Sequence, residues 1–113
     1  AGFGFVVLGT WEVEEIGIDG YVTRIRERLG DMPVYLSIDI DVLDPAFAPA
    51  TGTPEIGGFT SRELVGILRG LRGLHFVGAD VVEVAPAYDH ADITGIAAAN
   101  LVYEILALMS PSE

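Results

Sequence analysis

Apolar segments of two periodicities alternate along this chain, and their order constrains the fold more than any other feature. Short, strongly apolar runs predict buried strands at residues 3–8, 34–43 and 75–83. Segments with helical spacing separate and follow these runs, one ending at Gly30 and the others spanning residues 61–71 and 89–109. Strands that alternate with helices predict a parallel sheet with helices packed on its faces, in a single domain of 113 residues.

Local signals mark the ends of the predicted helices. The glycines between residues 17 and 20 predict a break between a short first helix and a longer one, with Gly30 as its C-cap. Thr60 and Glu63 have the spacing of a capping box at the start of the next helix. Residues 44–59 are rich in Pro, Gly and Thr, which predicts a long loop.

An acidic pair lies in the strand predicted at residues 34–43. Asp39 and Asp41 are separated by one residue, so both side chains are expected on the same face of that strand. Ionised carboxylates placed side by side repel one another, and a bound cation removes that repulsion. Oxygen ligands favour a hard ion such as Mg²⁺ or Mn²⁺. Asp80 and Glu83 end the strand predicted at residues 75–83, and parallel strands bring both acidic groups to one edge.

The spacing of Asp39 and Asp41 alone leaves several interpretations open. Solvated acids on an edge strand, a phosphatase-type nucleophile loop and a glycosyltransferase metal motif all share it. The phosphatase interpretation lacks the Gly-Thr or Thr that usually follows the second aspartate. An EF-hand loop is excluded, because Leu43 occupies the third ligand position and the expected glycine is absent.

The charge balance indicates a preference for cationic ligands. Seventeen acidic residues oppose six basic ones, all arginine, which gives a net charge of −11. Such a surface repels nucleic acid and anionic membranes, so neither is an expected partner, whereas metal ions, amines and guanidines are favoured. The chain has no cysteine, which excludes disulfides and thiol catalysis and is typical of a cytoplasmic protein. No apolar run reaches the roughly 18 residues of a membrane-spanning helix.

Two longer elements around these acids resemble a known family. From Ser37 to Pro54 the sequence is SIDIDVLDPAFAPATGTP, and with the following Gly57 and Gly58 it resembles the second metal-binding signature of the ureohydrolases, the superfamily of arginase and agmatinase. The segment DVVEVAPAYD at residues 80–89 resembles the same family. The resemblance implies an arginase-like, three-layer α/β/α sandwich with a mainly parallel sheet. The resemblance also implies that residues 1–113 are the C-terminal portion of that single domain.

The resemblance also implies roles for individual residues. Asp39 and Asp41 match manganese ligands of a binuclear Mn²⁺ site, Thr53 matches a residue that lines the guanidine pocket, and Glu83 matches the carboxylate that binds the substrate guanidinium. The implied reaction is hydrolysis of a small cationic guanidino substrate to urea and an amine by a hydroxide that bridges the two metal ions. Family members are commonly homo-oligomers, either trimers or hexamers. Asp44, Pro45 and Gly52 are expected to shape the loop.

Within the family, both segments are most similar to agmatinases. Guanidinobutyrase and other amidinohydrolases share much of the pattern, and arginase is a poorer match. The two histidine motifs that complete the family's metal site, Gly-Gly-Asp-His and Asp-Ala-His-x-Asp, are absent, and the chain does not begin with methionine. We therefore expect a chain that begins within a longer protein and is inactive alone. The alternative is a non-enzymatic metal-binding or oligomerisation module that uses the apolar helix at residues 89–109.

The remaining polar residues near these elements have weaker indications. His75 precedes an apolar run, which is typical of a turn or surface residue, and Asp80 is interpreted as an acid that is either structural or supports the metal ligands from behind. Tyr88, Asp89 and His90 are expected to border the pocket entrance and contact the tail of the substrate.

Overall fold

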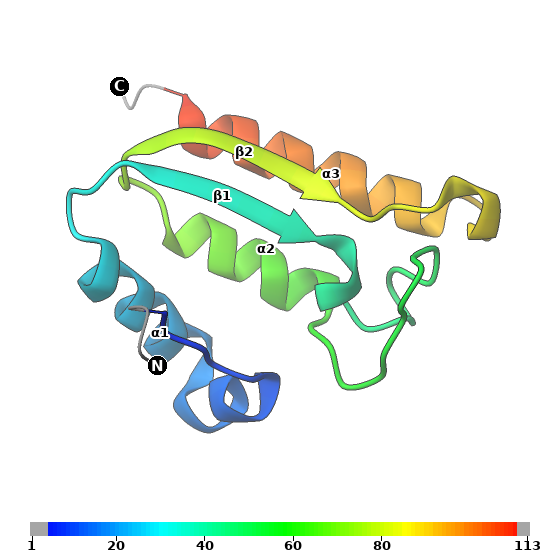
Figure 1. Cartoon of the computed structure of the whole chain (residues 1–113), viewed down its shortest axis with the longest axis horizontal. Helices are drawn as coiled ribbons and strands as arrows, with labels where there is room; N and C mark the ends of the chain where they lie inside the picture. Colours follow the sequence, from blue (N-terminus) through cyan, green and yellow to red (C-terminus); the bar gives the residue numbers. More distant parts are fainter. Residues whose placement is uncertain (1–4, 111–113) are drawn as a thin grey trace.

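The computed structural model describes residues 5–110 and contains a parallel sheet and the predicted helices, with two of the three predicted strands. In chain order the elements are α1 (Thr10–Leu29), β1 (Val34–Asp39), the 3-10 turn η1 (Ile40–Val42), α2 (Ser61–Gly70), β2 (Phe76–Val82), the 3-10 turn η2 (Pro86–Tyr88) and α3 (Ile93–Met109) (Figure 1). None of the helices within residues 5–110 has the length and apolar character needed to span a bilayer.

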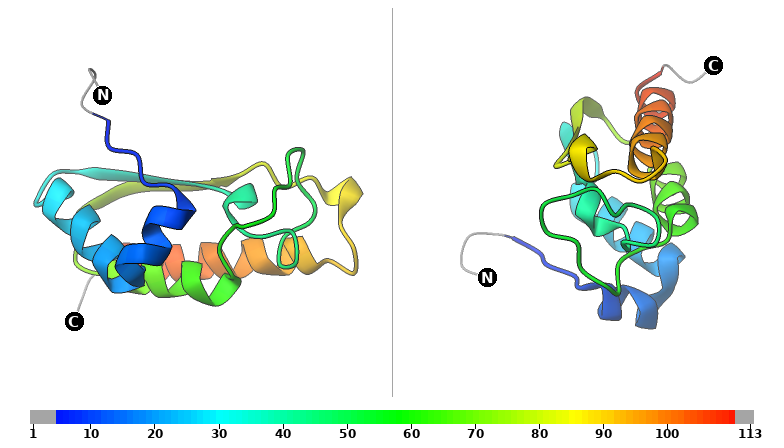
Figure 2. Two further views of the ribbon diagram at one scale, coloured as in Figure 1. Left: turned by 90° about the horizontal axis from the view of Figure 1, so that it is seen from below. Right: turned by 90° about the vertical axis from the view of Figure 1, so that its right-hand side faces the viewer.

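The two strands pair in parallel, as expected for strands joined through a helix. Ser37 is opposite Asp80, and Asp39 is opposite Val82, so both strands end at the same edge of the sheet. The helices α1, α2 and α3 all lie on one side of the sheet (Figure 2). Within residues 5–110 the other face of the sheet has no helix on it. The parallel α/β architecture is therefore confirmed, with the sheet and one helical layer present.

The core lies between the sheet and the helices. Ile38 on β1, Leu68 on α2 and Leu101 on α3 are each at most 5% exposed and belong to one apolar cluster. Helices α1 and α2 approach closely at Gly70, where an added Cβ would lie 2.9 Å from the Val22 methyl carbons. A residue without a side chain is required there, because interiors packed at crystal density have no room for an extra carbon.

The predicted helix signals are confirmed. Gly17 has φ 77° and ψ 166°, a non-helical conformation that breaks α1, and Gly30 with φ 53° follows its last residue. At α2 the Thr60 Oγ1 accepts from the Glu63 backbone N–H at 3.0 Å, and the Glu63 Oε1 accepts from the Thr60 N–H at 2.9 Å. This reciprocal capping box satisfies two amides that a helix start would otherwise leave unpaired.

One predicted strand is wrong and another is shorter than predicted. For the strand at residues 3–8, residues 3 and 4 lie outside the described residues, and Phe5–Leu8 forms no strand. A strand needs a hydrogen-bonded neighbour, and residues 5–110 supply none for this segment. Its side chains are accordingly exposed, Phe5 by 70% and Val7 by 80%. The strand predicted at residues 34–43 ends at Asp39, where the chain turns into η1.

The last strand and the last helix begin or end within a few residues of the predicted positions. The strand predicted at residues 75–83 spans Phe76–Val82, and the last helix begins at Ile93, after η2 and a turn. Ala91 and Asp92 in that turn have positive φ angles of 51° and 59°, which an α-helix does not allow.

Candidate functional site

Asp39 and Asp41 lie together at the carboxyl end of β1, although not as predicted. The Asp39 carboxylate accepts a hydrogen bond from the Asp41 backbone N–H at 3.0 Å and caps η1. The prediction that both residues extend from one strand face is wrong, because this bond ends the strand between them. Both aspartates nevertheless line one pocket of about 350 Å³. A capped turn therefore holds the two aspartates next to each other at the carboxyl end of β1.

Thr53 is brought to this pair from the loop after η1. Its hydroxyl donates to the Asp41 Oδ2 at 2.8 Å, and the side chain is exposed. Asp39, Asp41 and Thr53 thus form one hydrogen-bonded set. The sequence placed Thr53 near a substrate but gave no indication that its hydroxyl would orient Asp41.

The loop is shaped by Asp44, as expected. One carboxylate oxygen accepts from the Ala46 N–H at 3.0 Å and the other from the Gly57 N–H at 3.0 Å. These hydrogen bonds hold the pKa of Asp44 below its usual value, against a smaller opposing effect of burial. At Gly58 an added Cβ would lie 2.7 Å from both the Asp44 nitrogen and the Val42 oxygen, so only glycine fits. Asp44 therefore ties the start of the loop to its end at Gly57, shortly before α2 begins.

Glu83 directly follows β2 in an unusual conformation. Its φ of 69° places a non-glycine residue in the left-handed region, which typically costs about 1–3 kcal/mol and is found most often at functional sites. Glu83 is not part of the hydrogen-bonded set of Asp39, Asp41 and Thr53. Its segment is joined to the Thr53 loop through the backbone, where the Ala85 N–H donates to the Ala50 carbonyl at 2.8 Å.

Asp80 links the two strands on the open face of the sheet. Its carboxylate accepts hydrogen bonds from the hydroxyls of Ser37 and Tyr35 on β1, the latter at 2.8 Å. The Ser37 hydroxyl and then the Tyr35 hydroxyl hold the pKa of Asp80 below its usual value, while burial acts in the opposite direction. The structural role predicted for Asp80 agrees with these contacts.

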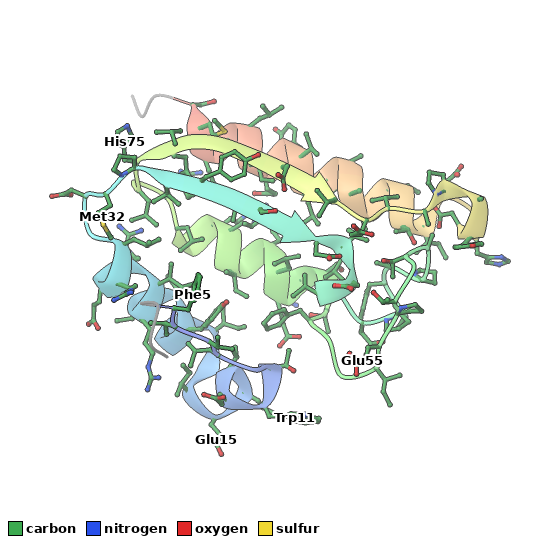
Figure 3. All side chains as sticks on the ribbon, in the orientation of Figure 1. Phe5, Trp11, Glu15, Met32, Glu55 and His75 are labelled. Atoms are coloured by element: carbon green, nitrogen blue, oxygen red, sulfur yellow. The ribbon has the colours of Figure 1, made fainter. Side chains whose placement is uncertain are left out.

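The Asp89 carboxylate binds backbone amides at the start of α3. Its Oδ1 accepts from the His90 and Thr94 N–H groups at 2.9 and 3.0 Å, and its Oδ2 accepts from the Gly95 N–H at 2.9 Å. Both oxygens are engaged by amides at the start of α3, and the expectation that Asp89 contacts a substrate tail stays a prediction. His75 is exposed at the beginning of β2, at the opposite end of the sheet from Asp39 (Figure 3), in agreement with its predicted surface position.

Two buried threonines of this region were missed by sequence reasoning. Thr94 is fully buried and accepts the Ala50 N–H at 2.9 Å. Thr51 is 4% exposed, and its hydroxyl has no hydrogen-bond partner among the described residues. Thr51 lies within the segment Ser37–Pro54, but nothing in that pattern indicates a buried hydroxyl, and Thr94 lies in an otherwise apolar helix.

The donor atoms of Asp39 and Asp41 suit a hard divalent cation. Both are carboxylates, and the hydrogen bonds described above engage Oδ1 of Asp39 and Oδ2 of Asp41. Carboxylate oxygens are the ligands preferred by Mn²⁺ and Mg²⁺. No group of three or more potential ligands comes together within residues 5–110. The pair therefore fits part of a metal site and does not complete one.

The comparisons with known proteins agree with this geometry. The model of the arginase family matches residues 1–108, so this chain belongs to the arginase family. It is 64% identical over 106 residues to putative agmatinase 3 of Schizosaccharomyces pombe, covering 94% of this chain and 26% of that protein.

Two solved structures are similar to this chain over nearly its whole length. A hypothetical agmatinase from Burkholderia thailandensis is 51% identical with a TM-score of 0.90, covering 94% of this chain and 34% of that one. Proclavaminate amidino hydrolase from Streptomyces clavuligerus is 49% identical with a TM-score of 0.93, covering 96% of this chain and 36% of that one. The predicted arginase-like fold is confirmed. The chain spans between about a quarter and about a third of the length of these relatives.

Proposed function

We propose that residues 1–113 are the C-terminal portion of a single ureohydrolase domain, whose intact form hydrolyses a small cationic guanidino compound to urea and an amine. The observation that supports this most strongly is the hydrogen-bonded set of Asp39, Asp41 and Thr53 at the carboxyl end of β1, in a chain of the arginase family. Ligands of parallel α/β proteins bind at this edge of the sheet.

Asp39 and Asp41 are proposed to hold manganese, in a binuclear site completed by ligands outside residues 5–110. When bound, the metal ions lower the pKa of a water molecule and so supply a nucleophile at neutral pH. Thr53 donates to Asp41 and restrains the orientation of this carboxylate. Without further ligands a pair of aspartates cannot complete the metal site, so residues 1–113 alone are proposed to be inactive.

Glu83 is proposed to accept hydrogen bonds from the guanidinium of the substrate. A planar guanidinium pairs well with a fixed carboxylate, and the left-handed backbone at Glu83 fixes where its side chain emerges. The net charge of −11 attracts a cation to the site. Agmatine is the favoured substrate because of the similarity to putative agmatinase 3. Guanidinobutyrate or another amidino compound is the alternative, supported by the similarity to proclavaminate amidino hydrolase.

A trimer or hexamer in the cytoplasm is the proposed state of the intact protein. An apolar surface on α3 favours an assembly role, since Tyr103 and Leu106 are 71% and 60% exposed. The same surface supports the second candidate function, a non-enzymatic metal-binding or oligomerisation module.

The test is urea release from agmatine, 4-guanidinobutyrate and arginine with added Mn²⁺. It is measured on this chain and on a form extended upstream to include the two histidine motifs. We expect activity only in the extended form. Asp41→Asn should lower it by more than about 100-fold, since even residues behind the metal ligands cost roughly 10- to 100-fold. Asp31→Asn, in the exposed turn before β1, is the matched control. If the folded, manganese-loaded extended protein released no urea, the proposal would be contradicted. The second candidate function, a non-enzymatic metal-binding or oligomerisation module, would then be favoured.

A further inference from the structure

Two separate segments contain the proposed substrate residues, and a buried hydroxyl joins them. Thr53 lies in the loop after η1, and Glu83 lies between β2 and α3. We propose that Thr94 is a positioning residue that fixes these two segments to each other and thereby sets the spacing of the guanidinium site. This inference rests on the proposed function.

The connection runs through Ala50, which lies in the Thr53 loop. The Ala50 N–H donates to the Thr94 Oγ1 at 2.9 Å, and the Ala50 carbonyl accepts from the Ala85 N–H at 2.8 Å. Ala50 and Thr94 are both 0% exposed, so water cannot replace either group. Both backbone groups of one loop residue are thus bonded to the segment that follows Glu83. A displacement of either bond would move Thr53 relative to Glu83.

Asp89 holds Thr94 in the required orientation. Its carboxylate accepts from the Thr94 and Gly95 N–H groups at 3.0 and 2.9 Å. With its backbone N–H held by Asp89, Thr94 presents its hydroxyl oxygen as the acceptor of the Ala50 N–H. Burial alone would raise the pKa of Asp89, but these hydrogen bonds outweigh it and lower the pKa. Asp89 therefore remains ionised at neutral pH as the fixed acceptor behind Thr94.

The backbone before α3 shows that this placement is strained. Ala91 and Asp92 both have positive φ angles, of 51° and 59°, although neither is glycine. This turn brings the Asp89 carboxylate back over the first amides of α3. A threonine that only filled space would need neither the turn nor the carboxylate, and valine would serve equally well in its place.

The experiment compares Thr94→Val, which keeps the shape and removes the hydroxyl, with Thr94→Ser, which keeps the hydroxyl. The intact manganese-loaded protein is used, at a temperature where each variant is fully folded. Thr60→Val is the matched control, because the Thr60 hydroxyl also accepts a backbone N–H, that of Glu63, and bonds to neither site segment. Steady-state hydrolysis is measured together with hydrogen exchange by mass spectrometry of peptides covering residues 44–53 and 83–89.

For Thr94→Val we expect faster exchange in both peptides and a kcat/KM about 10- to 100-fold lower, since small misplacements of a site are that costly. Much of this loss should be in KM, because Glu83 and Thr53 hold the guanidinium. Thr94→Ser should restore both measurements, and Thr60→Val should change neither.

The outcomes that overturn the inference are distinct from failure of the proposed function. Unchanged exchange in Thr94→Val would show that Thr94 does not join the segments. Faster exchange with unchanged KM and kcat would show a purely structural threonine. If the unmodified intact protein released no urea, the proposed function would fail, and Thr94 would lose its role as a positioning residue even where exchange showed that it joins the two segments.

Discussion

The two faces of the sheet differ in what their side chains contact. On the face beneath the helices, Ile38 is 5% exposed and packs in the same cluster as Leu68 and Leu101. On the opposite face, Tyr35 is 62% exposed, and its hydroxyl bonds to Asp80. The covered face is held by apolar burial and the open face by hydrogen bonds between side chains.

The comparison separates the residues that stabilise this fold from those that build its site. Side chains of a strand alternate between faces, so Tyr35, Ser37 and Asp39 form one row on the open face. This row leads from the Asp80 network to the carboxylate that caps η1. Changes on the covered face should therefore affect stability first, and changes along the open row should affect ionisation and the site.

The largest effect on stability is expected on the covered face. Leu68→Ala removes a side chain that is 1% exposed and leaves a cavity between α2 and the sheet. The free energy of unfolding of the intact protein should fall by about 2–5 kcal/mol, measured by chemical denaturation. Tyr35→Phe, on the open face, should change it much less. An equal loss in the two variants would remove the distinction between the faces.

A smaller effect is expected from the cap of the helix that covers the sheet. Thr60→Ala removes the hydroxyl that accepts the Glu63 N–H, and helix caps contribute about 0.5–2 kcal/mol. Ser61→Ala is the matched control one position along, within α2. Denaturation midpoints compared at equal m-values would measure both, and a Ser61→Ala loss as large as that of Thr60→Ala would argue against the capping role.

The smallest effect, present at neutral pH and lost in acid, is expected on the open face. The folded-state pKa of Asp80 is lowered by the Ser37 and Tyr35 hydroxyls. Its contribution to stability is therefore fully present above the unfolded value of about 4 and is lost as the pH falls through the folded value. Asp80→Asn should flatten the decline in stability below about pH 4, as followed by circular dichroism. Identical acid transitions in Asp80→Asn and the unmodified protein would show that the hydrogen bonds of Asp80 do not contribute to stability.

Sequence patterns predicted the elements that depend on local signals. The period-two alternation in β1, the Thr60–Glu63 capping box and the break at Gly17 are all determined within a few residues, and each is present. The apolar run at residues 5–8 shows the limit of such signals. Phe5 and Val7 have high strand propensity, but a strand also needs a hydrogen-bonded neighbour, and propensity contains no information about that partner.

The geometry of the candidate site was only partly predictable. The sequence placed the acidic pair and Glu83 at the ends of two different predicted strands. It did not indicate the capped turn between Asp39 and Asp41. That turn depends on a side chain bonding to the backbone, which competes with strand pairing without changing the apolar pattern. The Ala50–Thr94 bond joins positions far apart in the chain, and no local rule predicts it.

The most direct test of the central claim is a crystal structure of the intact protein with Mn²⁺ and a guanidino compound. Our account predicts anomalous density for manganese in contact with both Asp39 and Asp41, and the guanidinium against the Glu83 carboxylate. Manganese bound away from these aspartates, or a guanidinium that does not contact Glu83, would contradict it.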